Sequence, residues 1–193
     1  MLIVGSEARP TVFLDRDGTL NVEVNYLHRI ADLVLIPGAA AAIKRLNQAY
    51  YYVVVVTNQA GIARGYYDEA ALHQLHEHLL SVLAAEGATI DAFYFCPHHP
   101  DFTGPCACRK PGTGMLLQAV QDLNIDLAHS WLVGDTASDL AAGREVGCRT
   151  VLVRTGYGRK TERDLVADEP HPIAIVDDIG AAIDFILSTA SDD

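Results

Sequence analysis

Two aspartates one residue apart stand at the end of a short apolar run. Asp15 and Asp17 follow the run TVFL at residues 11–14 and precede Gly18. An apolar run of this length beside turn residues is typical of a buried strand, so the two charges are expected where that strand leaves its sheet. In an open α/β sheet, ligands bind at this edge. Carboxylates so close together repel each other unless a cation or a shared proton compensates them. Of these, Mg²⁺, which takes oxygen ligands and often shares them with phosphate, is favoured.

A second group of metal-ligand residue types lies in the segment 96–110. Three thiols and one imidazole occur there within a few residues of each other: Cys96, His98, Cys106 and Cys108. They make up the Cys₃His set of a closed, tetrahedral zinc site. The segment is rich in proline and glycine, and zinc would stabilise it by tying its ends together. His99 offers the same imidazole as its neighbour His98, so spacing alone leaves the fourth ligand open between them.

Polar side chains also end two further apolar runs. Thr57 and Asn58 follow the run YYVVVV at 51–56, and Asp135 ends the run WLVGD. Runs rich in β-branched residues are typical of the central strands of a parallel sheet. Because the carboxyl ends of parallel strands meet at one edge of the sheet, these side chains are expected close to Asp15.

Two adjacent cations, Arg109 and Lys110, directly follow the cysteine-rich segment. A guanidinium is planar and can bind phosphate through two parallel hydrogen bonds, so Arg109 suits a contact to a phosphorylated substrate. The zinc segment would hold both cations in place.

Four short patches occur in order at predicted strand ends: DRDGT from Asp15, VTNQ from Val56, RKP from Arg109 and GDTASD from Gly134. This ordered set resembles the four motifs of the haloacid dehalogenase superfamily of phosphotransferases. The resemblance implies phosphomonoester hydrolysis in which Asp15 is the nucleophile and becomes an aspartyl phosphate. Asp17 would then be the general acid and base.

The same resemblance implies roles for the other polar residues. The Thr57 hydroxyl would donate to the transferring phosphoryl group, and Lys110 would offset the negative charge of the nucleophile and the phosphate. Asp139 would orient either a metal-bound water or Lys110. The ligands of Mg²⁺ would come from three aspartates: Asp15, Asp17 through its backbone carbonyl, and Asp135.

A cysteine-rich loop before RKP resembles a zinc-binding subgroup of the superfamily, in which the position of His98 supplies the histidine ligand. The subgroup includes phosphatases of heptose bisphosphates and of histidinol phosphate. The segments NVEVNYLHRIADLVLIPG and VTNQAGIARGYY resemble substrate loops of the heptose branch, although Thr136 stands where some relatives carry a lysine. A small phosphorylated sugar is therefore the expected substrate. The resemblance and the strand-end positions together give nine expected substrate contacts: Glu23, Val24, Asn25, Tyr26, Thr57, Asn58, Gln59, Arg109 and Lys110.

Two other functions are open at this point. Histidinol phosphate would be hydrolysed with the same fold, metals and chemistry, and comparative rates would separate the two substrates. A zinc-stapled binding module without catalysis belongs to a different class, and it is disfavoured because every catalytic position is filled.

The elements that must position these residues point to a Rossmann-like three-layer α/β sandwich with a mainly parallel sheet. The chain of 193 residues suits one domain, 1–193, with the zinc loop at 96–110. Forty-one residues lie between Asp15 and Thr57, which leaves no room for a large cap domain. The pattern predicts strands at 11–14, 51–56, 91–96, 131–135, 149–154 and 173–176, and helices at 37–49, 68–86, 112–124, 137–146 and 179–187.

Composition limits the partners. Half of the residues are apolar and the formal net charge is −11, so we expect a globular chain that binds neither nucleic acid nor anionic membranes. The first residues lack a basic start, and the longest apolar run, 49–56, is too short for a bilayer. A cytoplasmic monomer is expected, with its cysteines reduced or bound to metal. Three histidines on the helix 68–86 are interpreted as members of a solvated face: His73, His76 and His78.

Overall fold

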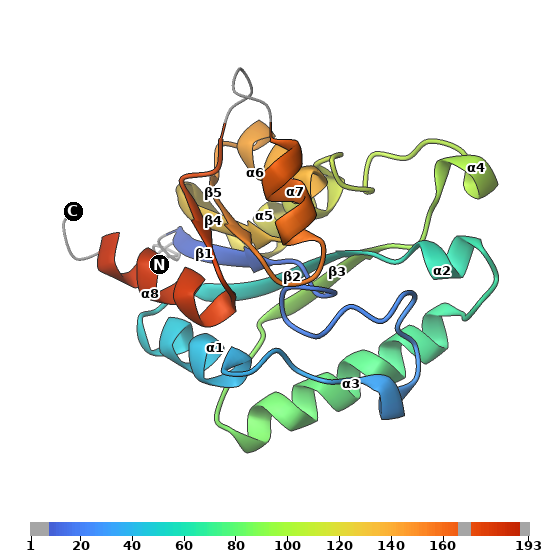
Figure 1. Cartoon of the computed structure of the whole chain (residues 1–193), viewed down its shortest axis with the longest axis horizontal. Coiled ribbons are helices and arrows are strands. Elements are labelled where there is room, and N and C mark those ends of the chain that lie inside the picture. Colours follow the sequence, from blue (N-terminus) through green and yellow to red (C-terminus); the bar gives the residue numbers. More distant parts are fainter. Residues whose placement is uncertain (1–7, 166–170, 190–193) are drawn as a thin grey trace, which may run out of the picture.

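The computed structural model describes residues 8–165 and 171–189 and contains a six-stranded parallel sheet (Figure 1). The strands lie in the order β3-β2-β1-β4-β5-β6. All the neighbouring pairs are parallel, as the apolar runs predict. The bounds of the strands are β1 Arg9–Leu14, β2 Tyr52–Asn58, β3 Ala92–Cys96, β4 Ile125–Gly134, β5 Arg149–Val153 and β6 Ala174–Val176.

Side chains alternate between the two faces of this sheet. Val12 and Leu14 of β1 belong to one apolar core, whereas Phe13 between them belongs to the other. The four consecutive valines of β2 divide in the same way. This is the period of two that a strand imposes, and it explains why a strand covered on both faces reads as a continuous apolar run.

Helices cover both faces, which completes the three-layer sandwich (Figure 1). Residues of α1, α3 and α8 pack in the first core, and residues of α5 and α6 pack in the second. The bounds of the helices are α1 Ala39–Gln48, α2 Ala60–Ala63, α3 Glu69–Ala85, α4 Pro100–Thr103, α5 Gly114–Leu123, α6 Ala137–Glu145, α7 Gly158–Asp164 and α8 Ile179–Thr189, with a short 3₁₀ turn η1 at Ile30–Asp32.

The strand order creates a switch point at the centre of the sheet. From β1 the chain runs outward to β2 and β3, then returns so that β4 lies on the other side of β1. A crevice forms at the carboxyl ends where the winding direction reverses, and such crevices bind ligands. Asp15 follows β1 and Asp135 follows β4, so both predicted Mg²⁺ ligands flank this crevice.

The predicted fold class is confirmed, with differences at the level of elements. Between β1 and β2 the chain forms a loop, η1 and α1, and no cap domain is inserted there. The structure adds three short helices that the sequence pattern did not predict: α2, α4 and α7. Strand β4 begins at Ile125, earlier than the predicted 131, because Ile125 and Asp126 already pair with β1. The register then shifts, and regular pairing continues from Trp131.

Local signals explain the helix starts. Helix α3 begins after Asp68, whose carboxylate accepts a hydrogen bond from the Ala71 amide at 2.9 Å. Helix α1 begins at Ala39 rather than at the predicted residue 37, because Gly38 has a left-handed φ of 82° that does not continue a helix. Within the described residues, no helix is long and apolar enough to cross a membrane.

Candidate active site

Three buried carboxylates meet at the switch point of the sheet. Asp15 comes from the end of β1, Asp135 from the end of β4 and Asp139 from the first turn of α6. One oxygen from each lies within 4.8 Å of the others. Asp139 is fixed by a capping box, because its Oδ2 accepts hydrogen bonds from the Thr136 amide at 3.0 Å and from the Thr136 hydroxyl at 2.6 Å.

Lys110 is the cation that balances this cluster. Its Nζ lies 2.6 Å from Asp15 Oδ1, 2.6 Å from Asp139 Oδ1 and 2.6 Å from the Val56 carbonyl oxygen. Hydrogen bonds to Asp15 Oδ1 and to the Val56 carbonyl oxygen use two of the three donors of this ammonium group, and the contact with Asp139 Oδ1 is an ion pair. Although burial alone favours neutral lysine, the two carboxylates raise the pKa of Lys110 above its ordinary value. The contact between Asp139 and Lys110 is compatible with the role in which Asp139 orients Lys110.

Lys110 compensates the charge of the carboxylates only in part. Burial, and then the neighbouring carboxylates, raise the pKa of Asp15 to about 7 in spite of Lys110. Burial and the charge of Asp15 raise the pKa of Asp135 to about 8. A bound proton or a bound cation would relieve the repulsion that disfavours the ionised form of these carboxylates.

The arrangement around Asp135 fits Mg²⁺. Its Oδ2 accepts a hydrogen bond from the Tyr157 amide at 2.7 Å, whereas Oδ1 is buried without a hydrogen-bond partner among the described residues. Two loops approach this carboxylate at Gly18 and Gly156, where a Cβ atom would collide with it, and both glycines have positive φ. An unpaired buried carboxylate oxygen in a set of hard oxygen ligands suits a divalent cation of this kind.

The Asp17 side chain points to a different set of partners. Arg16 Nη2 lies 2.8 Å from Asp17 Oδ2, and Asn21 Nδ2 donates to Asp17 Oδ1 at 3.0 Å. Gln59 Nε2 donates to Asp17 Oδ2 at 3.0 Å. Hydrogen bonds thus hold the Asp17 carboxylate apart from the group formed by Asp15, Asp135 and Asp139. This arrangement is compatible with a contact between Asp17 and the metal through its backbone carbonyl alone.

Arg16 and His76 are buried polar residues that the sequence reasoning did not identify. Arg16 is fully buried, and its Nη1 lies 3.0 Å from His76 Nε2. His76 stacks on Phe93 with ring centroids 4.4 Å apart and is only 5% exposed. The interpretation of all three helix histidines as solvated is therefore wrong for His76. Its spacing of four residues from Leu72 and three from Leu79 places it on the apolar face of α3, and this signal could have revealed it.

The predicted substrate residues lie around one cavity of about 300 Å³. From the loop after β1, Glu23, Asn25 and Tyr26 line it, while Val24 is 40% exposed and is not among the lining residues. Burial, followed by the charge of Asp17, raises the pKa of Glu23. The other lining residues on the predicted list are Thr57, Asn58, Gln59, Arg109 and Lys110.

Two of these residues are tied to the backbone beside the cavity. The Asn58 side chain forms a pair of hydrogen bonds with the main chain of Lys110, at 3.0 and 3.1 Å. Arg109 Nη1 donates to the His98 carbonyl oxygen at 3.3 Å. The end of β2 and the cysteine-rich loop therefore both position the RKP segment.

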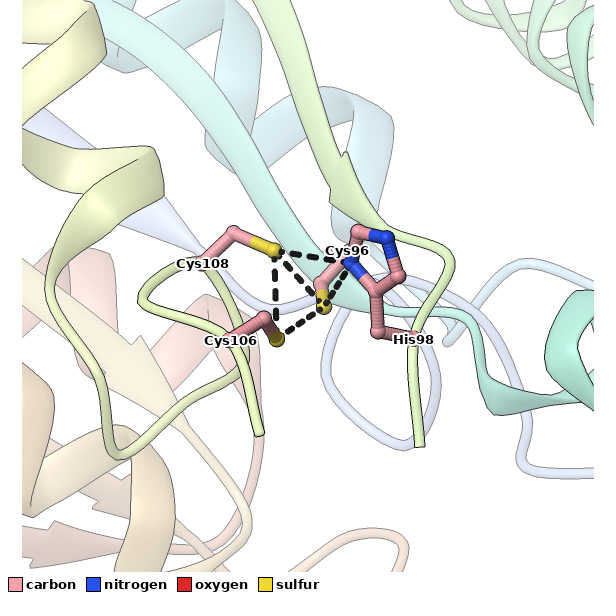
Figure 2. A group of neighbouring side chains, drawn as sticks. All are labelled: Cys96, His98, Cys106 and Cys108. Carbon is pink, nitrogen blue, oxygen red and sulfur yellow. Dashed lines mark hydrogen bonds between the residues drawn. The ribbon is translucent and has the colours of Figure 1, made fainter. Parts of the chain in front are cut away.

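The four predicted zinc ligands come together at one point (Figure 2). Cys108 Sγ lies 3.0 Å from Cys96 Sγ and 3.4 Å from Cys106 Sγ, and His98 Nδ1 lies 3.4 Å from Cys108 Sγ. Sulfurs bound to one zinc ion at about 2.3 Å would be about 3.8 Å apart in a tetrahedron, so this cluster is slightly tighter than a loaded site. Burial raises the pKa of the Cys96 thiol, and a metal would offset that effect by binding the thiolate.

His99 has a different environment from His98. Its Nδ1 accepts a hydrogen bond from the Asp101 amide at the start of α4, and the residue lines the active-site cavity. The His98 imidazole lies with the three thiols, whereas His99 is not part of that group, and this distinguishes two adjacent imidazoles that sequence spacing leaves equivalent.

The sheet topology and the strand-end carboxylates define a class, the haloacid dehalogenase-like hydrolases. A family model described as "HAD-hyrolase-like" matches residues 107–182. The crystal structure of a D,D-heptose 1,7-bisphosphate phosphatase from B. bronchiseptica, complexed with magnesium and phosphate, superposes with a TM-score of 0.86. It is 38% identical in sequence, and the match covers 93% of this chain and 99% of that chain.

Close relatives narrow the class. The D-glycero-D-manno-heptose-1,7-bisphosphate 7-phosphatase of Thermosynechococcus vestitus is 45% identical over 189 residues, covering 93% of this chain and 96% of the relative. The D-glycero-beta-D-manno-heptose-1,7-bisphosphate 7-phosphatase of Haemophilus ducreyi is 46% identical over 166 residues, covering 83% and 91%. The chain belongs to this family of heptose bisphosphate phosphatases, which are phosphoric monoester hydrolases. The resemblance seen in the motifs is confirmed.

Proposed function

We propose that this chain is a Mg²⁺-dependent phosphatase that removes the 7-phosphate of D-glycero-D-manno-heptose 1,7-bisphosphate. The observation that carries the proposal is the convergence of Asp15, Lys110 and Asp135 at the switch point, where all three line one cavity. The names of the relatives supply the substrate.

The chain's own residues account for the proposed reaction. A carboxylate oxygen of Asp15 attacks phosphorus and forms an acyl phosphate, while the bond from phosphorus to the sugar oxygen breaks. Asp17 gives a proton to the departing sugar oxygen and then takes one from the water that hydrolyses the aspartyl phosphate. The Thr57 hydroxyl and the charge of Lys110 stabilise the phosphoryl oxygens.

Mg²⁺ would be held by Asp15, Asp135 and the Asp17 carbonyl, where it would supply a positive charge that polarises the phosphoryl group. The magnesium in the B. bronchiseptica structure supports the choice of Mg²⁺ as the ion. The unpaired Oδ1 of Asp135 supports it independently of any relative.

We infer that Zn²⁺ is bound by Cys96, His98, Cys106 and Cys108 as a structural ion. Its task would be to fix the loop that carries Arg109 and Lys110. Substrate selection then falls to this loop and to Glu23 through Tyr26, since no cap domain lies between β1 and β2.

The wider setting belongs to the same proposal. Site residues come from β1 through α6, so we propose that 1–193 acts as one catalytic domain. The single domain is the basis for proposing a monomer, and the acidic balance is the basis for proposing that it binds neither nucleic acid nor anionic membranes. We place it in the cytoplasm, where its cysteines would stay reduced or bound to metal. Its product would serve ADP- or GDP-heptose synthesis for lipopolysaccharide core or surface polysaccharide.

The test is phosphate release with Mg²⁺ on three substrates: the heptose bisphosphate, histidinol phosphate and a sugar monophosphate. We expect kcat/KM to be highest for the heptose bisphosphate and to vanish in Asp15→Asn with the fold retained. A preference for histidinol phosphate would overturn the substrate but not the chemistry. Turnover by Asp15→Asn would overturn the nucleophile, and inactive wild-type protein would favour a binding module.

A further inference from the structure

Gln59 is buried between the residues proposed for catalysis. The residue is only 2% exposed, and its side-chain amide has four hydrogen-bond partners. Nε2 donates to Asp17 Oδ2 at 3.0 Å and to Thr57 Oγ1 at 2.7 Å. Oε1 accepts from the Tyr67 hydroxyl at 2.6 Å and from Arg16 Nη2 at 3.2 Å.

The orientation of this amide is dictated by its neighbours. A guanidinium can only donate, so the atom facing Arg16 must be the amide oxygen. The contact with the Asp17 carboxylate, which accepts when ionised, requires the amide nitrogen on the opposite side. Two independent charged neighbours therefore select the same orientation.

The amide has no capacity left for a substrate. A glutamine side chain offers two N–H donors and one oxygen with two lone pairs, and all of these are used. Although Gln59 borders the cavity, it could bind a sugar only by giving up a buried partner, which costs free energy.

The two donated hydrogen bonds have a chemical consequence. Because Thr57 Oγ1 accepts from Gln59, its own hydroxyl proton is free to point elsewhere, toward the phosphoryl position. The same nitrogen holds Oδ2 of Asp17, the group that would protonate the leaving oxygen. Arg16 and Asn21 also hold the Asp17 carboxylate. The Gln59 amide alone among these links that carboxylate, the proposed proton donor, to the Thr57 hydroxyl, which would donate to the phosphoryl group.

The backbone of Gln59 is fixed as well. Its amide N–H donates to the Cys96 carbonyl oxygen at 2.8 Å, at the point where β3 enters the cysteine-rich loop. Tyr67 packs against Gly61, where a Cβ atom would collide with the ring, so the partner of Oε1 is also held in place.

We propose that Gln59 is a positioning residue that aligns the Asp17 carboxylate with the Thr57 hydroxyl, and that it is not a substrate ligand. The inference rests on the proposed function, since it takes Asp17 to be the general acid. It replaces the substrate contact that the sequence motif suggested for Gln59.

The test uses a series of substituted phenyl phosphates, which contain no sugar. The 4-nitrophenolate ion is weakly basic and leaves without receiving a proton. The leaving oxygen of phenyl phosphate is more basic, so its departure is faster when a general acid protonates it. Since kcat/KM reports steps up to departure of this group, its dependence on leaving-group basicity measures proton donation by Asp17.

Two variants of similar size remove the donors of Gln59. Gln59→Glu keeps an acceptor for Arg16 and Tyr67, and Gln59→Met avoids the added charge if the first variant folds poorly. In both we expect the ratio of kcat/KM for phenyl phosphate to that for 4-nitrophenyl phosphate to fall at least about tenfold, toward the ratio of Asp17→Asn. Tyr67→Phe removes one contact of Oε1 and leaves both donated bonds, so its ratio should stay within about twofold of wild type.

The outcomes are separable. If the Gln59 variants lose activity equally across the series, or if Tyr67→Phe changes the ratio as much as they do, the positioning role is overturned while the proposed function stands. If wild type already shows the ratio of Asp17→Asn, then Asp17 is not the acid, and the proposed mechanism fails together with this inference.

Discussion

At the residue scale, the active site depends on a balance of buried charge. Three carboxylates share a single ammonium group, Lys110, within the described part of the chain around the switch point. Removing one partner of a buried ion pair leaves the other uncompensated, which costs more than the pair itself contributes.

We expect Lys110→Met to lower the free energy of unfolding by about 3 kcal/mol in metal-free buffer and to reduce kcat/KM by about a thousandfold or more. Denaturant unfolding and phosphate release measure the two effects. Lys44→Met is the matched control, because Lys44 is exposed, and it should change stability by less than about 0.5 kcal/mol. Equal losses of stability in both variants would contradict the claim that Lys110 balances the buried carboxylates.

His76 provides a prediction of pH dependence. Burial, and next the charge of Arg16, lower its pKa to about 3, with Asp17 acting in the opposite direction and His73 in the same one. The unfolded chain therefore binds one proton more than the folded chain between about pH 6.5 and pH 3, so this residue makes stability fall as the pH is lowered through that window.

The expected loss from His76 is about 2 kcal/mol between pH 7 and pH 5. His76→Gln retains a group that can accept from Arg16 but does not titrate, so its stability should fall less over this range than that of wild type. Denaturant unfolding at both pH values is the measurement. His73→Gln, at an exposed position of the same helix, leaves His76 in place and is the control, so its stability should fall more over this range than that of His76→Gln.

At the scale of elements, the cysteine-rich loop supports the end of the active site that carries the RKP segment. The loop joins β3 to α5, and its His98 carbonyl accepts from Arg109. Loss of metal from this loop should therefore also lower substrate turnover.

We expect Cys106→Ala to lose the bound zinc and to lower kcat/KM by at least about tenfold, since a structural site needs all four ligands. Metal analysis of the purified protein, which we expect to show about one zinc per chain in wild type, checks the first part. Cys148→Ala removes a buried thiol outside the cluster and should keep its zinc. Zinc retained by Cys106→Ala would contradict the ligand set.

At the scale of the whole molecule, folding brings together two carboxylates at the switch point that lie far apart in sequence. Asp15 and Asp135 follow neighbouring strands, β1 and β4. A cation bound between them stabilises only the folded chain, since the unfolded chain does not bring them together.

Mg²⁺ should therefore raise the midpoint of thermal unfolding. At a concentration of about one hundred times its Kd, the expected gain is about 2.7 kcal/mol. Asp135→Asn should remove most of this response, and NaCl at equal ionic strength controls for screening of the surface charge. An unchanged response in Asp135→Asn would place the ion elsewhere.

Much of the fold could be predicted from local pattern. Runs such as the valines of β2 are buried on both faces, so they mark central strands without knowledge of their neighbours. The capping residue Asp68 likewise marks the start of α3. Short helices such as α7 were missed because one or two turns carry too little periodicity to stand out.

The sequence by itself determined which residue types could do chemistry and at which strand ends they stand, because motif residues follow directly from apolar runs that must be strands. Only the tertiary structure decided how those residues use their atoms. It separated His98 from His99, buried His76 against Phe93, and committed the Gln59 amide to Asp17 and Thr57. The physical reason is that burial and hydrogen-bond partners arise from segments distant in sequence, which the local pattern of a chain does not record.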